Sequence, residues 1–414
     1  MLPADPTRKL AIASRAKTFI VLVFVFFLAA FAGMRFSASL PGADFPDFYC
    51  AARMLAEGHG HQLYDPDVQR QYQARYSGRV GTLYIHPPFE AVLYLTVSWL
   101  PLRRAYFLQF LLNLAFLAAG LRRLANDRLL PWNWSVLLAA SLTFVPLLLC
   151  LQQGQDSLLL LLFLILSYTA LRRERAFAAG CWLALGLFKF QIVLPLLLVL
   201  VFAQNTGARN ALAKGFSVVA LSLAAVSAAL SGVSVFTVYP GFLLRLHAQP
   251  FAGIIPLAMA NFRGLTYFFL GSNQSSYAVA AVSILSAAAL LRTLTVGKHA
   301  RLAPQSLATG APQDEFDPAF ANAVMFALLV SYHLNPHDLT LLLLPIALLL
   351  PRTLAPTPRQ PRPAHWRMTL GLLGILFFPM LHLWALKAGV YALVSLPLLA
   401  LFLSARPSRT KPHS

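Results

Sequence analysis

The sequence predicts an all-α protein that crosses a membrane many times. Of its 414 residues, 58% are hydrophobic and only 11% are charged, and the mean hydropathy is +0.66. A soluble protein of this length could not keep so much apolar surface away from water. The apolar residues also form separate runs that short basic clusters divide. We therefore expect about twelve transmembrane helices, which form a single integral membrane domain over residues 1–414.

The apolar runs differ in length, and several are shorter than the roughly 20 residues that an upright transmembrane helix needs. The first run is too long for the apolar core of a usual signal peptide, so we interpret it as a retained span. The runs at 176–188 and 190–203 could instead form one broken helix. The candidate spans are 18–36, 104–121, 133–151, 156–171, 176–188, 190–203, 215–232, 276–293, 318–333, 338–351, 367–384 and 388–404.

The distribution of basic residues predicts the topology. A formal net charge of +19 could suggest nucleic acid binding, but these residues lie between apolar runs, as in loops retained in the cytoplasm. All the basic clusters fall on the cytoplasmic side if residues 87–101 do not cross. As a helix this segment would reach only about 23 Å, against a hydrocarbon core of about 30 Å. We therefore expect cytoplasmic termini and an outer loop at 37–103. Residues 301–317 and 352–367, rich in Pro and Ala, are then cytoplasmic loops.

The sequence gives little sign of a cofactor. Its three cysteines are an odd number without metal-ligand spacing, so they predict neither a disulfide framework nor a zinc site. We find no nucleotide-sugar motif and no clear metal cluster, and we expect no cofactor and no bound metal. The one pair that could bind a divalent ion is Asp44 and Asp47, three residues apart.

The expected outer loop concentrates the acidic residues of the chain. Phe48, Ala51, Ala52 and Leu55 recur at helical spacing, which predicts an amphipathic juxtamembrane helix suited to the membrane surface. Asp44 or Asp47 could cap this helix, and since one cap is enough, the other needs a different role. Asp65, before Pro66, is expected to cap a second helix through Val68–Tyr76. The six acidic residues of the stretch, out of fourteen in the chain, are Asp44, Asp47, Glu57, Asp65, Asp67 and Glu90.

Several other polar groups fall on the same predicted side. Polar residues at membrane depth are costly and tend to be functional, so their gathering on one face suggests one outward-facing active site. Lys189 interrupts an apolar run; it could snorkel, or it could meet an anion such as phosphate. Arg245, Arg263 and His337 are weaker candidates of this kind, and Asp338 beside His337 could equally cap a helix. The segments expected on this side are 44–90, the turn 152–156, the loop 233–275 and residues 331–338.

A series of short motifs resembles glycosyltransferase family 87, whose members are polytopic enzymes of the glycosyltransferase-C superfold. They include mannosyltransferases that act on phosphatidylinositol mannosides. The resemblance extends from about residue 18 to about residue 350. The motifs are D-F-Y-C-A-A-R-M-L-A-E-G…L-Y-D at 47–65, Y-I-H-P-P at 84–88, G-Q-D at 154–156, A-G…K…P at 179–195 and N-F-R at 261–263.

The resemblance implies a polyprenyl-phosphate sugar donor that is used on the outer side of a bacterial inner membrane, toward the periplasm. It implies a catalytic base in the first outer loop, which falls on Asp47. His86 stands where the family pattern leads us to expect an aromatic residue before Pro-Pro. The residues expected at the donor phosphate are Lys189, Arg263 and His86. Those expected to contact substrate are Asp44, Tyr84, Gln155, Asn261 and His337.

This chemistry agrees with what the residues themselves indicate. A positioned carboxylate can take the proton of an acceptor hydroxyl as that hydroxyl attacks the anomeric carbon. A cation can stabilise the leaving phosphate. With one base and no second carboxylate as nucleophile, a single inverting displacement is the simpler course. We expect a hexosyltransferase, with mannose as the candidate sugar and a lipid or glycan as the acceptor. The alternatives are a transporter or flippase of lipid-linked sugars, for which we find no internal repeat, and a non-catalytic scaffold.

Overall fold

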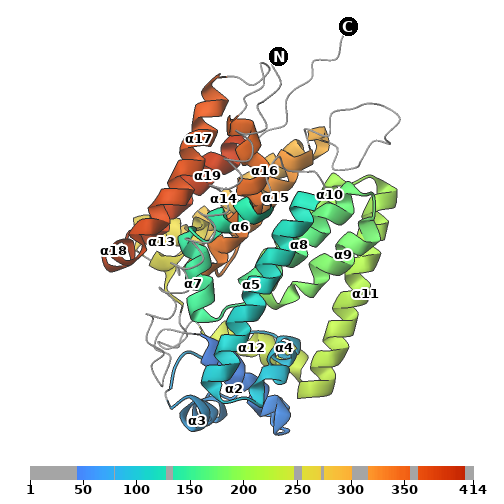
Figure 1. Cartoon of the computed structure of the whole chain (residues 1–414), viewed down its shortest axis with the longest axis vertical. Helices are drawn as coiled ribbons and strands as arrows, with labels where there is room; N and C mark the ends of the chain where they lie inside the picture. Colours follow the sequence, from blue (N-terminus) through green and yellow to red (C-terminus); the bar gives the residue numbers. More distant parts are fainter. Residues whose placement is uncertain are drawn as a thin grey trace, which may run out of the picture.

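The protein is built from helices, and the regular structure of the described residues includes no strand (Figure 1). The first expected span, 18–36, lies outside the described part of the chain. The computed structural model describes residues 44–78, 80–126, 134–246, 254–271, 275–300, 316–354 and 362–405.

Membrane-spanning length is reached by several helices. The pair α9 (Ala176–Leu185) and α10 (Phe190–Ala203) bends by 64° at a short break, and it makes a fifth candidate if the two helices form one span. Shorter apolar helices include α8 (Ser157–Arg172) and α15 (Phe316–Val330). These helices confirm an all-α chain suited to a membrane, whereas the number twelve stays a prediction. The four segments long and apolar enough alone are α5 (Leu102–Asn126), α11 (Thr206–Ser231), α14 (Ser276–Ala300) and Trp366–Lys387.

Two expected boundaries were wrong. The run 133–151 forms two helices, α6 (Trp134–Ser141) and α7 (Val145–Gln153), because the chain is extended at Phe144 and restarts with Pro146 in the first turn. Proline is tolerated there since the first amides of a helix need no intrahelical partner. The segment 233–275, expected as a loop, contains α12 (Val235–Arg245) and α13 (Phe262–Leu270).

The C-terminal linker was also more helical than expected. Helix α16 (Leu343–Leu354) enters the segment 352–367, and α17 (Arg362–Phe377) begins within it. Helix α17 continues through a short 3-10 turn into α18 (His382–Lys387), and α19 (Ser395–Ser404) packs against α17. The other predicted loop, 301–317, lies outside the described residues except for its last two, which start α15.

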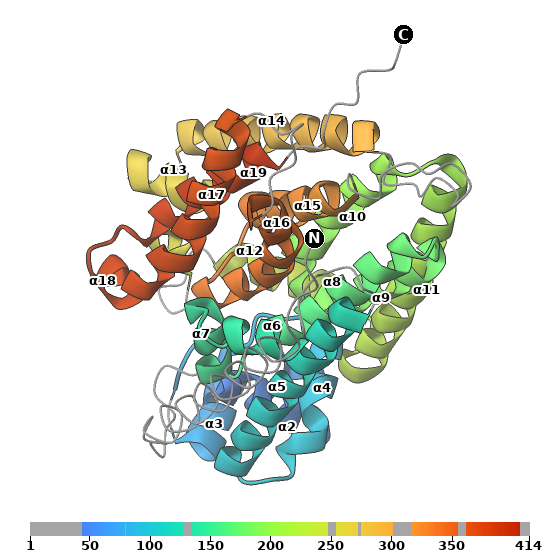
Figure 2. The same cartoon turned by 45° about the horizontal axis from the view of Figure 1, so that its top comes forward.

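Helices α2 (Phe45–Ala56), α3 (Pro66–Ser77) and α4 (Pro88–Ser98) form what we call the N-terminal layer. The layer lies at one end of the molecule together with α12, at the bottom of Figure 1. Helices α5, α8, α9 and α11 run away from it as one group, and both views show α9 beside α11. Helix α14 packs on α10 and α15 and lies across the far side in Figure 2. The start of α8 and the α9–α10 break therefore lie between the N-terminal layer and the rest of the bundle.

Small residues let α9 and α11 approach closely. A Cβ atom on Gly180 would lie 2.1 Å from the carbonyl oxygen of Leu212, and one on Gly215 would lie 2.0 Å from that of Phe177. Close backbone contact at small residues is a common way for helices to associate in membranes, where burial of apolar side chains gives little driving force. This pair therefore fixes α9, which precedes the break at Lys189.

Helix α2 is confirmed, but its apolar stripe does not face a membrane surface. The ring of Phe48 stacks on that of Tyr94 in α4, with centroids 4.8 Å apart, and Ala51 and Ala52 are buried. Protein side chains thus cover the face that periodicity alone assigned to lipid. Helix α4 has 11 residues, which is about 17 Å of helix and too short to cross a hydrocarbon core.

Helix α3 confirms the second predicted helix of this layer. The Asp65 carboxylate accepts hydrogen bonds from the backbone amides of Asp67 and Val68, as expected of a helix N-cap. Gly78 ends the helix in the left-handed conformation, with φ +68°.

Candidate functional site

The turn between α7 and α8 places polar groups beside the N-terminal layer. Gly154 has φ +68°, and a Cβ atom there would lie 2.6 Å from Cβ of Phe45 at the start of α2. The Asp44 amide donates to the Gln153 carbonyl oxygen at 3.0 Å, so the start of α2 is bound to the end of α7. Glycine is needed at this turn both for its backbone conformation and for the close approach. The turn delivers Gln155 and Asp156 to the centre of the molecule.

Lys189 lies at the break between α9 and α10 and is buried. Its Nζ atom lies 2.8 Å from Asp338 Oδ1 and 3.2 Å from Asp156 Oδ1. It also lies 3.4 Å from Gln155 Oε1, to which it donates. In sequence this lysine has no carboxylate near it, whereas the fold gives it two. Its ammonium charge is therefore compensated within the protein.

Asp338 takes part in a capping box and also pairs with Lys189. Its Oδ2 atom accepts from the Asn335 amide at 2.9 Å, at the start of the 3-10 helix Pro336–Leu342. Its Oδ1 atom accepts from Ser157 at 2.9 Å as well as from Lys189. The neighbouring His337 is buried, and its Nδ1 atom is hydrogen-bonded to Gln153 Oε1. The segment 331–338 thus joins the α7–α8 turn.

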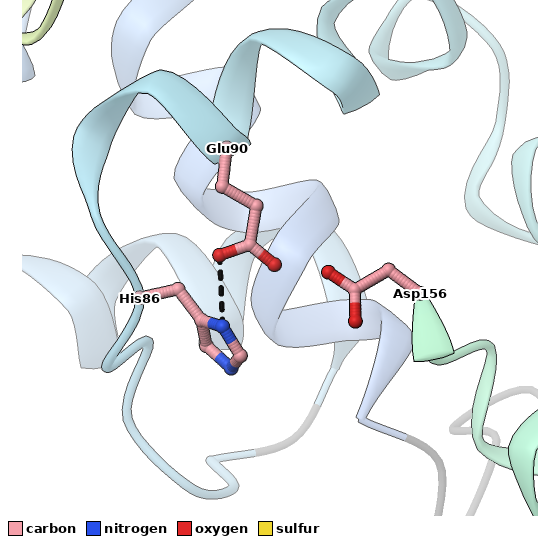
Figure 3. Close-up of side chains that lie close together, drawn as sticks. All are labelled: His86, Glu90 and Asp156. Carbon is pink, nitrogen blue, oxygen red and sulfur yellow. Dashed lines mark ion pairs between the residues drawn. The ribbon is translucent and has the colours of Figure 1, made fainter. Parts of the chain in front are cut away.

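A second polar group lies at the start of α4. His86 Nδ1 and Glu90 Oε2 are 2.8 Å apart, and the carboxylate of Asp156 points toward that of Glu90 (Figure 3). Burial lowers the pKa of His86 to about 4, so its imidazole is neutral at ordinary pH. Tyr84 donates to the Pro87 carbonyl oxygen at 2.8 Å, which holds the turn before the helix.

Asp44 and Asp47 take different positions at the start of α2. Asp47 is buried, with Gln73 donating to its Oδ1 atom at 2.9 Å and Thr82 donating to its Oδ2 atom. Asp44 is half-buried and occupies the N-cap position, but its side chain makes no capping hydrogen bond. Instead its Oδ2 atom accepts from Gln155 Nε2 at 2.6 Å. The simple capping explanation therefore does not describe either residue.

Asn261 and Arg263 lie at the start of α13, and their contacts lead to residues 331–332. Asn261 accepts from the Gly264 amide at 2.8 Å as the N-cap and donates to the Ser331 carbonyl oxygen at 2.6 Å. Arg263 donates to the Tyr332 carbonyl oxygen at 3.0 Å and lies over the ring of Tyr332, 4.2 Å from its centroid. Among the described residues, the Arg263 guanidinium contacts a carbonyl dipole and an aromatic face.

Comparison with models of protein families identifies the family of this chain. The model of glycosyltransferase family 87 matches residues 84–331, which is more than half of the 414 residues. The chain belongs to glycosyltransferase family 87. It is therefore a membrane glycosyltransferase, which acts on a sugar donor and an acceptor. No curated protein and no solved structure matches it.

The family-87 region contains His86, Glu90, Asp156 and Lys189, while Asp47 precedes it. Of the residues expected at the site, the structure joins six. His337 Nε2 lies 3.6 Å from Asp338 Oδ1, and Tyr84 donates to Glu90 Oε2 at 3.5 Å. Gln155 bridges Asp44 and Lys189, since it donates to the first and accepts from the second. His86 reaches the same cluster through Glu90, which lies with it and Asp156 in one compact group. Asp47 is linked to Gln73 and Thr82 instead.

Sequence reasoning did not assign three acidic members of this candidate site: Glu90, Asp156 and Asp338. Each stands at the edge of an apolar run, and all three are almost completely buried, at 0%, 1% and 1% exposed. Buried carboxylates are rare without a partner or a function. The signal that could have found them is the position of a carboxylate at the start of an apolar helical run.

The N-terminal layer of the enzyme has its own charged cluster around Glu57. Partial burial alone raises the pKa of this carboxyl, but hydrogen bonds from Tyr76 and Tyr72 outweigh it. The charges of Arg53 and Arg75 act in the same direction, so the pKa of Glu57 lies below its usual value. Burial and the bond to Glu57 raise the pKa of Tyr72 to about 12. The cluster connects α2 to α3 through Arg53, which donates to Glu57 at 2.8 Å and to Tyr76 at 2.8 Å.

Proposed function

We propose that this enzyme moves a hexose, with mannose as the first candidate, from a polyprenyl-phosphate donor to a lipid or glycan acceptor. The transfer takes place on the outer, periplasmic face of a bacterial inner membrane and inverts the anomeric centre. The observation that carries the proposal is the family match over residues 84–331. The cluster of buried charged side chains between the N-terminal layer and the bundle supports it, because such groups are costly at membrane depth.

Asp47 is the proposed general base. The Gln73 and Thr82 hydrogen bonds hold both of its carboxylate oxygens, which fixes the orientation of the side chain. A fixed carboxylate can accept the proton of an acceptor hydroxyl as the carbon–oxygen bond forms. Asp44 lies one helical turn earlier and bonds to Gln155. It is the competing candidate, since it is the more exposed of the two carboxylates.

The donor phosphate is proposed to meet Lys189, Arg263 and His86. These three differ in the charge that they offer. Lys189 is paired with two carboxylates, so it presents little free positive charge. Arg263 contacts a carbonyl oxygen and an aromatic ring, which leave its charge available to an anion. Within the proposal, Arg263 is therefore the stronger electrostatic contact and Lys189 an organiser of the site.

Membership of a glycosyltransferase family favours the enzyme over the transporter or flippase and over the scaffold. A transporter of lipid-linked sugars would move its cargo without breaking the bond between sugar and phosphate. The enzyme breaks that bond and passes the sugar to a hydroxyl group. The two functions can be separated by asking whether a new glycosidic bond forms.

The test is transfer by the purified full chain in lipid nanodiscs. Radiolabelled polyprenyl-phosphate hexoses and the corresponding nucleotide sugars are offered in parallel with a membrane lipid extract as acceptor. We expect a labelled product only with polyprenyl-phosphate donors, and NMR of the product should show the inverted anomeric configuration. Product from nucleotide sugars alone would overturn the donor assignment, and a retained configuration would overturn the single displacement.

A further inference from the structure

His86, Glu90 and Asp156 belong to two distant parts of the chain, and their side chains lie close together in the fold. His86 precedes α4, Glu90 lies in its first turn and Asp156 precedes α8. One ligand atom from each residue, a ring nitrogen or a carboxylate oxygen, lies within 4.8 Å of the others. The two carboxylates face one another beside the imidazole ring (Figure 3).

Two of the three side chains carry buried oxygen atoms that the described residues do not satisfy. Glu90 is 0% exposed and Asp156 is 1% exposed. Glu90 Oε1 and both carboxylate oxygens of Asp156 have no hydrogen-bond partner among the described residues. Lys189 reaches only Asp156 Oδ1, as an ion pair at 3.2 Å. Buried polar atoms are almost always paired in native proteins, so atoms left in this state call for an explanation.

The charges of the side chains at this position are also unbalanced. The carboxylates of Asp156 and Asp338 pair with one ammonium group, that of Lys189, and the carboxylate of Glu90 lies beside that of Asp156. Two of the three negative charges have no compensating cation among these side chains. Uncompensated buried charge is strongly unfavourable, so the pocket needs either protons or a cation. One divalent cation would neutralise it and would also occupy the unsatisfied oxygens.

We propose that His86, Glu90 and Asp156 bind one divalent transition-metal ion. A set of one imidazole nitrogen and two carboxylate oxygens suits Mn²⁺ or Zn²⁺ better than the all-oxygen preference of Mg²⁺ and Ca²⁺. Ligand atoms about 2.1 Å from one ion lie about 3–4 Å apart, so side-chain movements of under about 1 Å would close the site. The ion would join the start of α4 to the start of α8.

This site differs from the pair that the sequence suggested. Asp44 and Asp47 have separate partners, Gln155 for the first and Gln73 with Thr82 for the second. The proposal does not depend on which sugar or acceptor the enzyme uses. It is tested by metal binding itself, so its failure leaves the proposed glycosyl transfer untouched.

The first experiment measures Mn²⁺ binding to the full chain in detergent, purified without a histidine tag and freed of metal with EDTA. Electron paramagnetic resonance of free Mn²⁺ during a titration should show one ion bound per chain. Glu90→Gln and Asp156→Asn should each weaken binding at least about 10-fold. The matched controls are Glu174→Gln and Asp67→Asn, the same chemical changes at exposed positions, and they should bind as the unaltered protein does.

A second measurement covers the case in which the buried variants do not fold. Pulsed electron paramagnetic resonance of Mn²⁺ in the unaltered protein should show coupling to an imidazole nitrogen. That coupling should disappear in His86→Gln, since this side chain is the most exposed of the three. A bound ion without nitrogen coupling, or with coupling that survives His86→Gln, would overturn the assignment.

Failure to bind either Mn²⁺ or Zn²⁺ would overturn the proposal as a whole. The negative charge would then have to be removed by a proton on Glu90. That state has its own signature, a protonated carboxyl band in the infrared spectrum that is lost in Glu90→Gln. Observation of this band in the protein purified with its natural metal content would likewise count against the ion.

Discussion

Lys189 Nζ lies 2.8 Å from Asp338 Oδ1, although the two residues are 149 positions apart in the chain. Both side chains are buried. The pair links the break between α9 and α10 to the 3-10 helix before α16, and Asp156 adds the α7–α8 turn to the same ammonium group. One cation thus holds three segments together at the candidate site.

Replacing Lys189 should therefore destabilise the protein and also impair its activity. Lys189→Met keeps the length and burial of the side chain but leaves Asp338 and Asp156 without their compensating charge. Breaking a buried ion pair from one side costs about 3–5 kcal/mol. We expect a large fall in the melting temperature of the detergent-solubilised protein.

The matched control removes charge from the other side of the pair. Adding Asp338→Asn to Lys189→Met should restore part of the lost stability, because it takes away one of the orphaned carboxylates. An unchanged melting temperature in Lys189→Met would show that this lysine does not hold the three segments together.

Much of the N-terminal layer could be predicted from the sequence because its signals are local. The Asp65–Pro66 pair marks the start of α3, and the spacing of Phe48, Ala51 and Ala52 marks α2. These signals act within one or two helical turns. Periodicity tells which face of α2 is apolar, but it does not tell whether lipid or Tyr94 covers that face.

The site could be predicted only in part because its contacts are long-range. Lys189 was expected to matter as a lone charge, and the fold shows that Asp156 and Asp338 compensate it. No local pattern connects positions so far apart. Glu90 and Asp156 could be found only as acidic residues that begin apolar helices, and α12 escaped notice because Pro240 lies inside it.

The predicted topology can be tested with single cysteines at opposite ends of the molecule. Gln71 is exposed on α3, and Thr206 is exposed where α11 begins (Figure 1). Because the basic clusters are expected inside, Gln71→Cys should react with a membrane-impermeant maleimide added to intact cells, and Thr206→Cys should not.

The background for this experiment is small, since Cys50 and Cys150 are buried and Cys181 is partly buried. The unaltered protein measures it directly. Detergent permeabilisation should make Thr206→Cys react as well. Labelling of Thr206→Cys alone in intact cells would invert the topology and place the candidate site on the cytoplasmic side.

The Glu57 cluster predicts a pH dependence of stability. The folded-state pKa of Glu57 lies below its usual value, so the ionised carboxylate stabilises the folded N-terminal layer. This contribution is fully present above the usual pKa of about 4.3 and is lost as pH falls through the lower folded-state pKa. The melting temperature should therefore fall on acidification below about pH 5.

Glu57→Gln should lower the melting temperature at neutral pH and make its acid dependence shallower, because glutamine cannot lose a proton. Asp67→Asn is the matched control, since Asp67 pairs with Arg70 on the surface of α3. Surface pairs contribute little, so this variant should follow the unaltered protein. Equal acid sensitivity in Glu57→Gln would assign the effect to other groups.

Asp47→Asn tests the proposed base. Asparagine is nearly isosteric and can still accept from Thr82 or Gln73, so the layer should keep its fold, as an unchanged melting temperature would show. Asparagine cannot take the acceptor proton, so sugar transfer should fall by about 10²–10⁴-fold, the usual contribution of a general base. The rate is measured with saturating donor and acceptor in the nanodisc assay.

Asp44→Asn is the control for this test. Asp44 lies one helical turn away and bonds to Gln155, whereas Asp47 bonds to Gln73 and Thr82. If Asp47 is the base, Asp44→Asn should lose far less activity, since asparagine can still accept from Gln155. Loss of transfer in Asp44→Asn with an active Asp47→Asn would move the base to the more exposed carboxylate. Full activity in both variants would show that the base lies outside the start of α2, and the buried carboxylates around Lys189 would then be the next groups to test.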